Sequence, residues 1–432
     1  MPAALNAAEV NNSAAPADFS LTDFYRLALE RSESIKIARN QLSVAEQDVD
    51  RAFSALLPNL SAYGDYIRYE NESRIQPKSG REIGVKLQQQ FSVNGREFII
   101  LGAAKDTIKE REYDLDAVTE ENLFTVATAY YDIVNKRKRL EIAEENVVRL
   151  EAHKKAVVTR LRLEDVPKTA LLRTEAELSG ARSDLVQAKN ALALAFANLS
   201  RMLEISMEYD VVVPDAEGKI FIDDGMEKYV ETALERRPDI KSLEMAVKLA
   251  QENVDIMKSE YWPTISLEAG YKRQDTDPAF TDEKENLYGA VSLNLLLFDW
   301  GYRSSSISQE KLRQQNAAHQ LRAKSKEVAL AVERAFRTIT SAKSTIAALK
   351  DKLRFSRADY EAVSLQFEVG QADILDVLDS NTVLLNSARE LSEAQFTLAL
   401  AKIGLEKAQG VFLESVKAQL NDPSSPAGDG DK

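Results

Sequence analysis

Two stretches of the chain carry hydrophobic residues at every seventh position, which is the pattern of helices that pack along a coiled-coil seam. In the first stretch these positions are occupied by Leu171, Leu178, Leu185, Leu192 and Leu199. In the second stretch, 206 residues later, they are occupied by Val377, Leu384, Leu391, Leu398 and Leu405. The pattern predicts two long helical hairpins, over about residues 96–204 and 302–410, which reverse near 164–167 and 370–373.

Each helical hairpin is preceded by a segment in which apolar and polar residues alternate, as they do in a β-strand. We expect β-hairpins at about 59–93 and 264–298. Their strands offer about 9–11 residues, the length that crosses a bilayer when tilted, and the alternation is that of a membrane barrel. A surface hairpin of a soluble domain is the alternative. Two hairpins at matching places, with Trp262 and Trp300 flanking the second, favour membrane strands and an interfacial aromatic belt.

The second half of the chain repeats the first. Pro58 recurs 205 residues later as Pro263, and Gly95 recurs 206 residues later as Gly301. These four residues mark the expected crossings between helices and strands, and a helix is expected before each hairpin, at 21–57 and 226–261. The organisation therefore reads as an extended N-terminal tail (1–20), a first repeat (21–204), a linker (205–225), a second repeat (226–410) and a C-terminal tail (411–432) with a disordered end. Such a duplication predicts equivalent parts arranged around an axis.

Composition excludes several classes of protein. The formal net charge of −13 argues against a nucleic-acid partner, because phosphate binding needs a basic face. The absence of cysteine excludes a disulfide framework and a cysteine-ligated metal. No stretch reaches the roughly 18 consecutive apolar residues of a transmembrane helix. The N-terminus lacks the features of a signal peptide, so we expect the start of a mature or re-engineered exported chain, with a cytosolic protein as the alternative.

From Leu21 to Gly410 the chain resembles the TolC-like outer-membrane factors. The resemblance is carried by Phe367-Glu368-Val369-Gly370, by Leu57-Pro58 and Trp262-Pro263, and by Phe298-Asp299-Trp300-Gly301. It implies a mainly α fold with a membrane β-barrel, in which a homotrimer builds an α-helical barrel continuous with a 12-stranded β-barrel, four strands from each chain. From the residues alone, four strands cannot close a barrel whose minimum is about eight, which leaves two copies or three open.

The resemblance also implies a place and partners. The chain would lie in the outer membrane of a Gram-negative bacterium, contact its lipid and extend into the periplasm. A periplasmic adaptor and an inner-membrane transporter would complete a tripartite efflux or type I secretion system. The sequence leaves the exported substrate open among drugs, metal ions and proteins.

No constellation of residues predicts an enzyme, a cofactor site or a metal site. His153 and His319 lie on polar stretches of long helices, without a second ligand at metal-binding spacing, and we expect both on solvated helix faces. There is no glycine-rich phosphate loop, so the duct is expected to be passive. The competing interpretation is a soluble periplasmic scaffold or adaptor built on a coiled-coil hairpin.

The two predicted helical turns differ in charge. The first carries the bases Arg160, Arg162, Lys168 and Arg173 with the acids Glu164 and Asp165. The second carries only acids, at Glu368, Asp373, Asp376 and Asp379. We expect Asp376 and Asp379 to form an acidic ring at the periplasmic entrance, since residues three apart share a helix face. An ordinary solvated helix face is the alternative.

The turns are also the expected contacts for an adaptor or for gating, through the four basic residues, Glu164, Phe367, Gly370 and Asp373. Pairing between the basic and the acidic turn would close the entrance. Glu164 stands where Gly370 stands in the second repeat. Because Glu resists the left-handed backbone that Gly accepts, we expect the first turn to have a different backbone.

Overall fold

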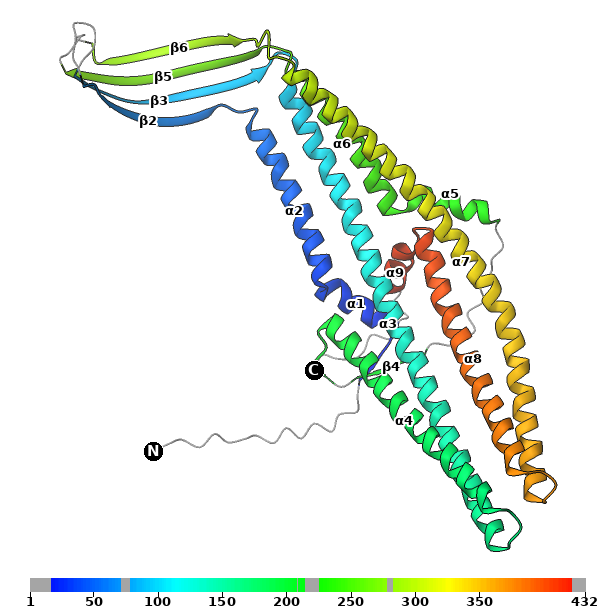
Figure 1. The fold of residues 1–432 in the computed structure, drawn as a ribbon. Coiled ribbons are helices and arrows are strands. Elements are labelled where there is room, and N and C mark those ends of the chain that lie inside the picture. Colours follow the sequence, from blue (N-terminus) through cyan, green and yellow to red (C-terminus); the bar gives the residue numbers. More distant parts are fainter. Residues whose placement is uncertain (1–16, 71–77, 208, 214–224, 278–282, 422–432) are drawn as a thin grey trace, which may run out of the picture. The chain divides into compact units, whose positions relative to one another are not determined.

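The computed structural model describes residues 17–70, 78–207, 209–213, 225–277 and 283–421. The predicted disordered end of the C-terminal tail and most of the N-terminal tail lie outside these residues. Along the chain the elements are β1 (Ala17–Phe19), α1 (Leu21–Arg31), α2 (Glu33–Ser54), β2 (Asn59–Arg68), β3 (Ser79–Ser92), α3 (Arg96–Arg162), α4 (Lys168–Leu203), β4 (Tyr209–Val211), α5 (Met226–Arg236), α6 (Pro238–Ser259), β5 (Thr264–Asp277), β6 (Glu285–Asn294), α7 (Tyr302–Glu368), α8 (Ile374–Ala408) and α9 (Phe412–Asn421) (Figure 1).

The chain divides into two compact units, and the two longest helices of the described residues, α3 and α7, contribute to both. The first unit comprises Met1–Lys36, Val118–Arg237 and Val328–Lys432, and the second comprises Ile37–Ala117 and Pro238–Glu327. At about 1.5 Å per residue, the 67 residues of α3 and of α7 each span on the order of 100 Å. No helix in the described ranges is long and apolar enough to cross a membrane.

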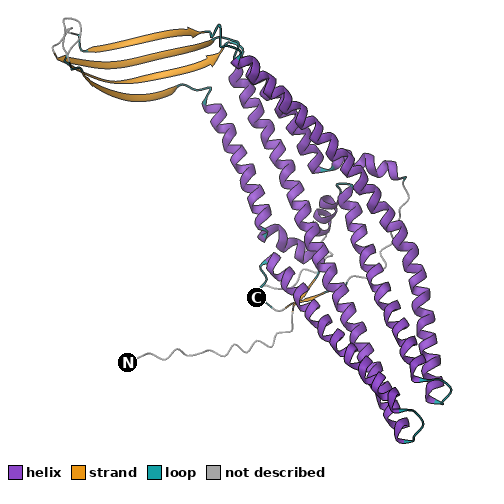
Figure 2. Ribbon diagram, viewed as in Figure 1, coloured by secondary structure: helices purple, strands orange, loops and turns teal. Residues whose placement is uncertain are grey.

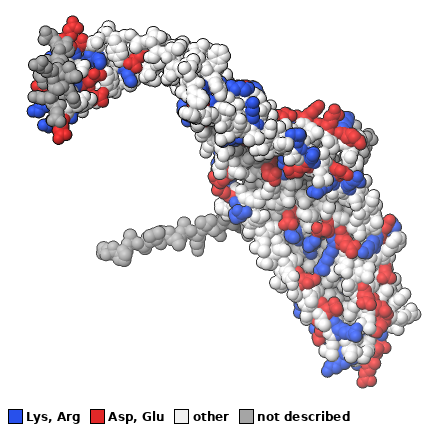
Figure 3. Space-filling view, turned by 45° about the horizontal axis from the view of Figure 1, so that its top comes forward, with Lys and Arg blue, Asp and Glu red and all other residues white. Residues whose placement is uncertain are grey.

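The second unit contains a four-stranded antiparallel sheet in the order β2-β3-β5-β6 (Figure 2). Because side chains alternate across a strand, one face of the sheet is apolar. Its exposed side chains include Leu60, Ile83, Val85, Leu87, Leu267, Leu287, Val291 and Leu293. In Figure 3 the visible middle of the sheet is almost free of charged side chains, which gather near its far end.

The opposite face of the sheet is polar and carries the same arrangement twice. Tyr63 lies opposite Gly84 and its hydroxyl donates to Glu82 Oε1 at 3.0 Å. Tyr288 lies opposite Gly270 and donates to Glu268 at 2.7 Å. A Cβ at either glycine would come within 3.0 Å of the tyrosine ring, so both positions need glycine.

The helices expected at 21–57 and 226–261 are each divided in two. The first is interrupted at Ser32, whose ψ of 122° lies outside the helical region, and the second at Arg237, with ψ of 128°. Arg237 precedes Pro238, which pushes the residue before it out of the helical conformation. The second hairpin was predicted to extend to residue 298, but β6 ends at Asn294. The last four residues of the predicted hairpin, 295–298, therefore have no strand partner among the described residues.

Among the described residues, the first unit contains two apolar clusters. One joins α1, α3, α4, β4 and α9 through buried Phe24, Tyr25, Leu199, Leu203 and Phe412. The linker strand β4 pairs with β1 in parallel, and Tyr130 of α3 donates a hydrogen bond to Val212 O beside it. The other cluster lies at the ends of the helical hairpins and contains Leu150, Val157, Leu178, Phe367 and Val377.

Candidate functional site at the helical turns

The turns that join α3 to α4 and α7 to α8 have the same backbone. Glu164 has φ of +60° and Gly370 has φ of +79°, both in the left-handed region. Asp165 N donates to Arg160 O at 2.9 Å, and Gln371 N donates to Gln366 O at 2.8 Å, 206 residues later. This is the left-handed helix ending in which glycine is usual. The prediction of a different first turn was wrong, because the hydrogen bonds hold Glu164 in a conformation that Glu tolerates at a cost.

Arg160 connects the two turns. Its Nη1 donates to Phe367 O at 2.6 Å, and its guanidinium carbon lies 4.6 Å from the centre of the Phe367 ring. Its Nε donates to Asp165 Oδ2 at 2.6 Å within its own turn. The basic turn therefore contacts the acidic turn through a backbone carbonyl and an aromatic face, and its carboxylate partner is local.

Two of the acids in the second turn cap a helix. Asp373 is the N-cap of α8, where its side chain accepts from Ile374 N at 2.6 Å. Asp376 accepts from Asp373 N at 3.1 Å, which completes a capping box. Asp379 is exposed one turn further along α8. Among the described residues no ion pair joins these acids to Arg162, Lys168 or Arg173, which are exposed.

Four polar residues of α3, spaced seven apart, bond to the second helical hairpin. Arg139 donates to Glu393 at 2.5 Å, Asn146 accepts from Asn381 at 2.9 Å, and His153 Nε2 lies 2.7 Å from Tyr360 Oη. Arg160, already described, is the fourth. We call these residues the polar ladder. The polar ladder was not predicted, although polar residues repeated every seven positions beside an apolar seam were a signal for it.

His153 is buried within the polar ladder, with 8% of its surface exposed. Burial lowers the pKa of His153, and the positive charge of Arg149 lowers it further against the opposing effect of Glu368. The prediction of a solvated face was wrong for His153, because Tyr360 of α7 covers the imidazole. His319 is exposed, as predicted.

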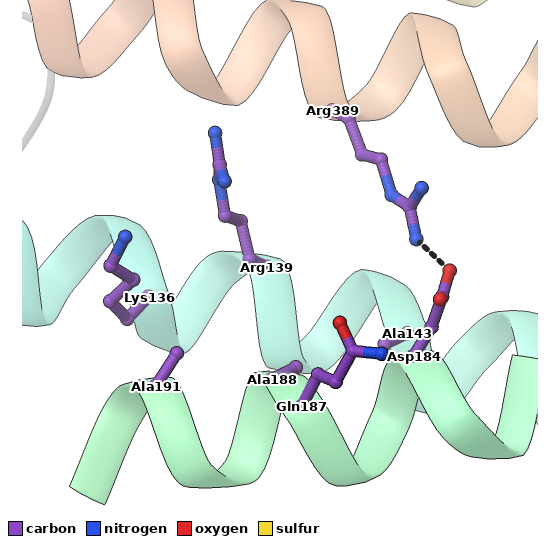
Figure 4. A pocket seen from close by; sticks show the side chains of 8 residues that line it. All are labelled: Lys136, Arg139, Ala143, Asp184, Gln187, Ala188, Ala191 and Arg389. Carbon is purple, nitrogen blue, oxygen red and sulfur yellow. Dashed lines mark hydrogen bonds and ion pairs between the residues drawn. The ribbon is translucent and has the colours of Figure 1, made fainter. Parts of the chain in front are cut away.

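A cleft of about 410 Å³ lies beside the ladder between α3, α4 and α8, and Figure 4 shows that Arg389 reaches across it to Asp184, at 2.8 Å. Its lining consists of Lys136, Arg139, Ala143, Asp184, Gln187, Ala188, Ala191 and Arg389. The described residues contain no group of three His, Asp or Glu side chains that could hold a metal ion. The chemistry of this region is that of ion pairs and hydrogen bonds between helices.

The predicted crossover residues lie at the ends of strands and helices. Gly95 and Gly301 have φ of +74° and +88°, which explains glycine at both positions. Pro58 lies between α2 and β2, and Pro263 O accepts a hydrogen bond from Val93 N at 3.0 Å. Trp262 is 55% exposed and Trp300 is 91% exposed, so both indole rings can contact solvent or lipid.

The chain is similar to outer-membrane efflux proteins and channels in sequence and in structure. The family described as "Outer membrane efflux protein" matches residues 24–203 and 229–411. The outer membrane protein TolC of Vibrio cholerae is 21% identical over 413 residues, which cover 93% of both chains. The outer membrane efflux protein BepC of Brucella suis is 22% identical over 393 residues, 90% of this chain and 85% of that protein. The Campylobacter jejuni CmeC outer membrane channel matches with a TM-score of 0.82 at 16% identity, over 98% of this chain and 97% of that one.

Proposed function

The chain belongs to the outer membrane efflux protein family, whose members are channels and not enzymes, and we propose that it is the passive exit duct of a tripartite efflux or secretion system. The predicted fold class is confirmed by the likeness to solved outer-membrane channels. In this proposal three copies form a closed barrel of twelve strands in the outer membrane. Their long helices form a second barrel across the periplasm.

The observation that supports the duct most strongly is the open four-stranded sheet. Its apolar face suits lipid, its polar face suits a water-filled lumen, and its edge strands β2 and β6 each pair on one side only. Hydrocarbon does not tolerate unpaired backbone groups, so such a sheet needs further strands to close it. Strands from other copies of the chain meet this need. Trp262 and Trp300 would then lie at the membrane interface.

We place the entrance of the duct at the two helical turns. Contacts through Arg160 hold the turns together in each chain, and three copies of Asp379 and Asp376 would ring the opening with carboxylates. A periplasmic adaptor bound to an inner-membrane transporter would open the entrance by replacing these contacts. In this proposal the duct itself is passive, so the transporter would supply both the energy and the choice of substrate.

Purified protein in mild detergent tests the proposal. The expected result is a stable trimer by native mass measurement, which then conducts ions across a planar bilayer. A monomer that remains soluble without detergent would contradict it. Co-purification of a transporter and an adaptor with the tagged chain would identify the system that the duct serves.

A further inference from the structure

In the described part of the chain no further strand pairs with either edge of the sheet, and the internal repeat specifies how these edges can be paired. In the first hairpin Asn59 lies opposite Gln88, and in the second Thr264 lies opposite Asn294. Thr264 is 205 residues after Asn59, and Asn294 is 206 residues after Gln88. The other nine residue pairs of the first hairpin, from Leu60–Leu87 to Arg68–Ser79, correspond to residue pairs of the second hairpin by the same two offsets. The repeat therefore preserves the pairing register as well as the fold.

The contact between the hairpins supplies a template for the contact between copies. Phe91 of β3 lies opposite Ile265 of β5. The residue 206 positions after Phe91 is Leu297, beyond the end of β6, and the residue 205 positions before Ile265 is Leu60, on β2. We propose that Leu297 of one copy lies opposite Leu60 of the next copy, in a β6–β2 pairing that repeats the β3–β5 register. This inference rests on the proposed assembly of copies into a barrel.

The side chains at these positions suit the pairing. Leu297 is 84% exposed and Leu60 is 74% exposed, so both are free for a neighbour. In the same register Leu293 lies opposite Gly64 and Val291 opposite Tyr66. Leu60 and Gly64 lie on the apolar face of β2, as Leu293 and Val291 do on β6. A shift by one residue would instead place apolar side chains of one copy beside polar side chains of the other.

Two of the four contacts of the polar ladder give oppositely charged pairs when they are transferred in the same way. Asn146 and its partner Asn381 map onto Lys352 of α7 and Glu175 of α4, and His153 with Tyr360 maps onto Asp359 and Lys154. Both of these transferred pairs have opposite charges, whereas the other two ladder contacts transfer to uncharged pairs, Thr345 with Gln187 and Gln366 with Leu161. Lys154 already binds Glu175 at 2.8 Å within the chain, and Lys352 binds Glu390 at 2.7 Å. Between copies these side chains would join in one network of alternating charge, with Asp359 at its end.

Cysteine crosslinking tests the register, because the chain contains no cysteine of its own. We expect Leu60→Cys with Leu297→Cys to give covalent oligomers on oxidation, at least tenfold more than Ala62→Cys with Leu297→Cys. The second pair is shifted by two residues on the same face. Phe91→Cys with Ile265→Cys is the matched control that should close within one chain, because these residues are paired in the structure. Closure of this control without any crosslink in the variant that carries Leu60→Cys and Leu297→Cys, or preferential crosslinking of the shifted pair, would overturn the proposed register.

The helical part has its own test. Asp359→Lys should lower the dissociation temperature of the oligomer, whereas Glu361→Lys, an equal charge change at an exposed position two residues along the same helix, should not. Equal effects of both substitutions would overturn the transferred helix contact. Native mass and conductance of the unmodified protein separate this outcome from failure of the duct itself: a conducting trimer with negative crosslinks refutes only the register, and a monomer without conductance refutes the duct as well.

Discussion

The guanidinium of Arg160 lies against Phe367, to which it is joined by a hydrogen bond to the carbonyl and by stacking on the ring. These two contacts connect the turn of one helical hairpin to the turn of the other. They involve no carboxylate of the second turn, so they do not depend on the charges that surround it. Phe367 itself is buried in the apolar cluster of the hairpin ends.

Replacement of Arg160 should therefore favour separation of the turns. A hydrogen bond and a cation–π contact together contribute about 1–2 kcal/mol in each chain. Arg160→Ala is expected to raise the open probability in single-channel recordings, and Arg160→Lys to raise it less. Arg162→Ala is the matched control, because Arg162 is exposed at the end of the same helix. An unchanged open probability in Arg160→Ala would remove this contact from the gate.

The shared left-handed backbone gives a prediction on stability. Glu164→Gly should stabilise the first turn, because a left-handed conformation costs a non-glycine residue about 1–2 kcal/mol while the added flexibility of glycine costs about 0.5–1 kcal/mol. Gly370→Ala should destabilise the second turn by a similar net amount. A Cβ at Gly370 has no neighbour nearer than 3.6 Å, so its effect reports the backbone alone. Chemical denaturation of the two variants checks the opposite signs.

The long-range features of the fold were predictable where a local pattern repeats. The heptads predicted both helical hairpins, and alternation predicted the strands, because each pattern extends over many residues. Pro238 could have revealed the break at Arg237, and the duplication could have carried that break to Ser32, which has no proline after it.

The candidate site was less predictable because its contacts join residues that are 207 to 254 positions apart. His153 sits in a polar stretch, and only the approach of Tyr360 from α7 buries it. Charge suggested that Arg160 would pair with an acid of the second turn. Its partner there is a backbone carbonyl, which every residue carries and which leaves no signal in the sequence.

Buried His153 predicts a loss of stability in acid. Its folded pKa lies below the ordinary value of about 6.5, so the unfolded chain binds the proton first as the pH falls. This contribution to stability is complete above the unfolded pKa and decreases as the pH falls from about 6.5 towards the folded value. His153→Asn should reduce the difference in melting temperature between about pH 7.5 and about pH 5.5, on either side of the ordinary histidine pKa. His319→Asn, at an exposed position, should leave that difference as in the parent protein.

The buried amides of the polar ladder should specify register. Asn381 Nδ2 donates to Asn146 Oδ1, and both side chains are at most 5% exposed. Asn146→Leu leaves the amide of Asn381 without this acceptor, at an expected cost of about 1–3 kcal/mol. Replacing both by Leu should recover only part of the stability, because Asn381 Oδ1 also accepts from Arg149 Nε at 3.0 Å and this bond is lost in the double variant. A double-mutant cycle by chemical denaturation measures the coupling, and additive single costs would show that the two amides act independently.

The final prediction separates the capping role of Asp376 from the charge of the entrance. Asp376→Asn keeps an oxygen that can accept from Asp373 N, so α8 should keep its capping box while one negative charge is lost. Asp379 has no such role, and Asp379→Asn removes charge alone. Six carboxylates in three copies would attract multivalent cations, and each substitution should weaken block by such cations added on the periplasmic side. Asp376→Ala, which also removes the cap, should lower thermal stability by about 1 kcal/mol in addition. If both Asn variants kept the block and conductance of the parent, Asp376 and Asp379 would be ordinary helix surface and the proposed acidic ring would be refuted.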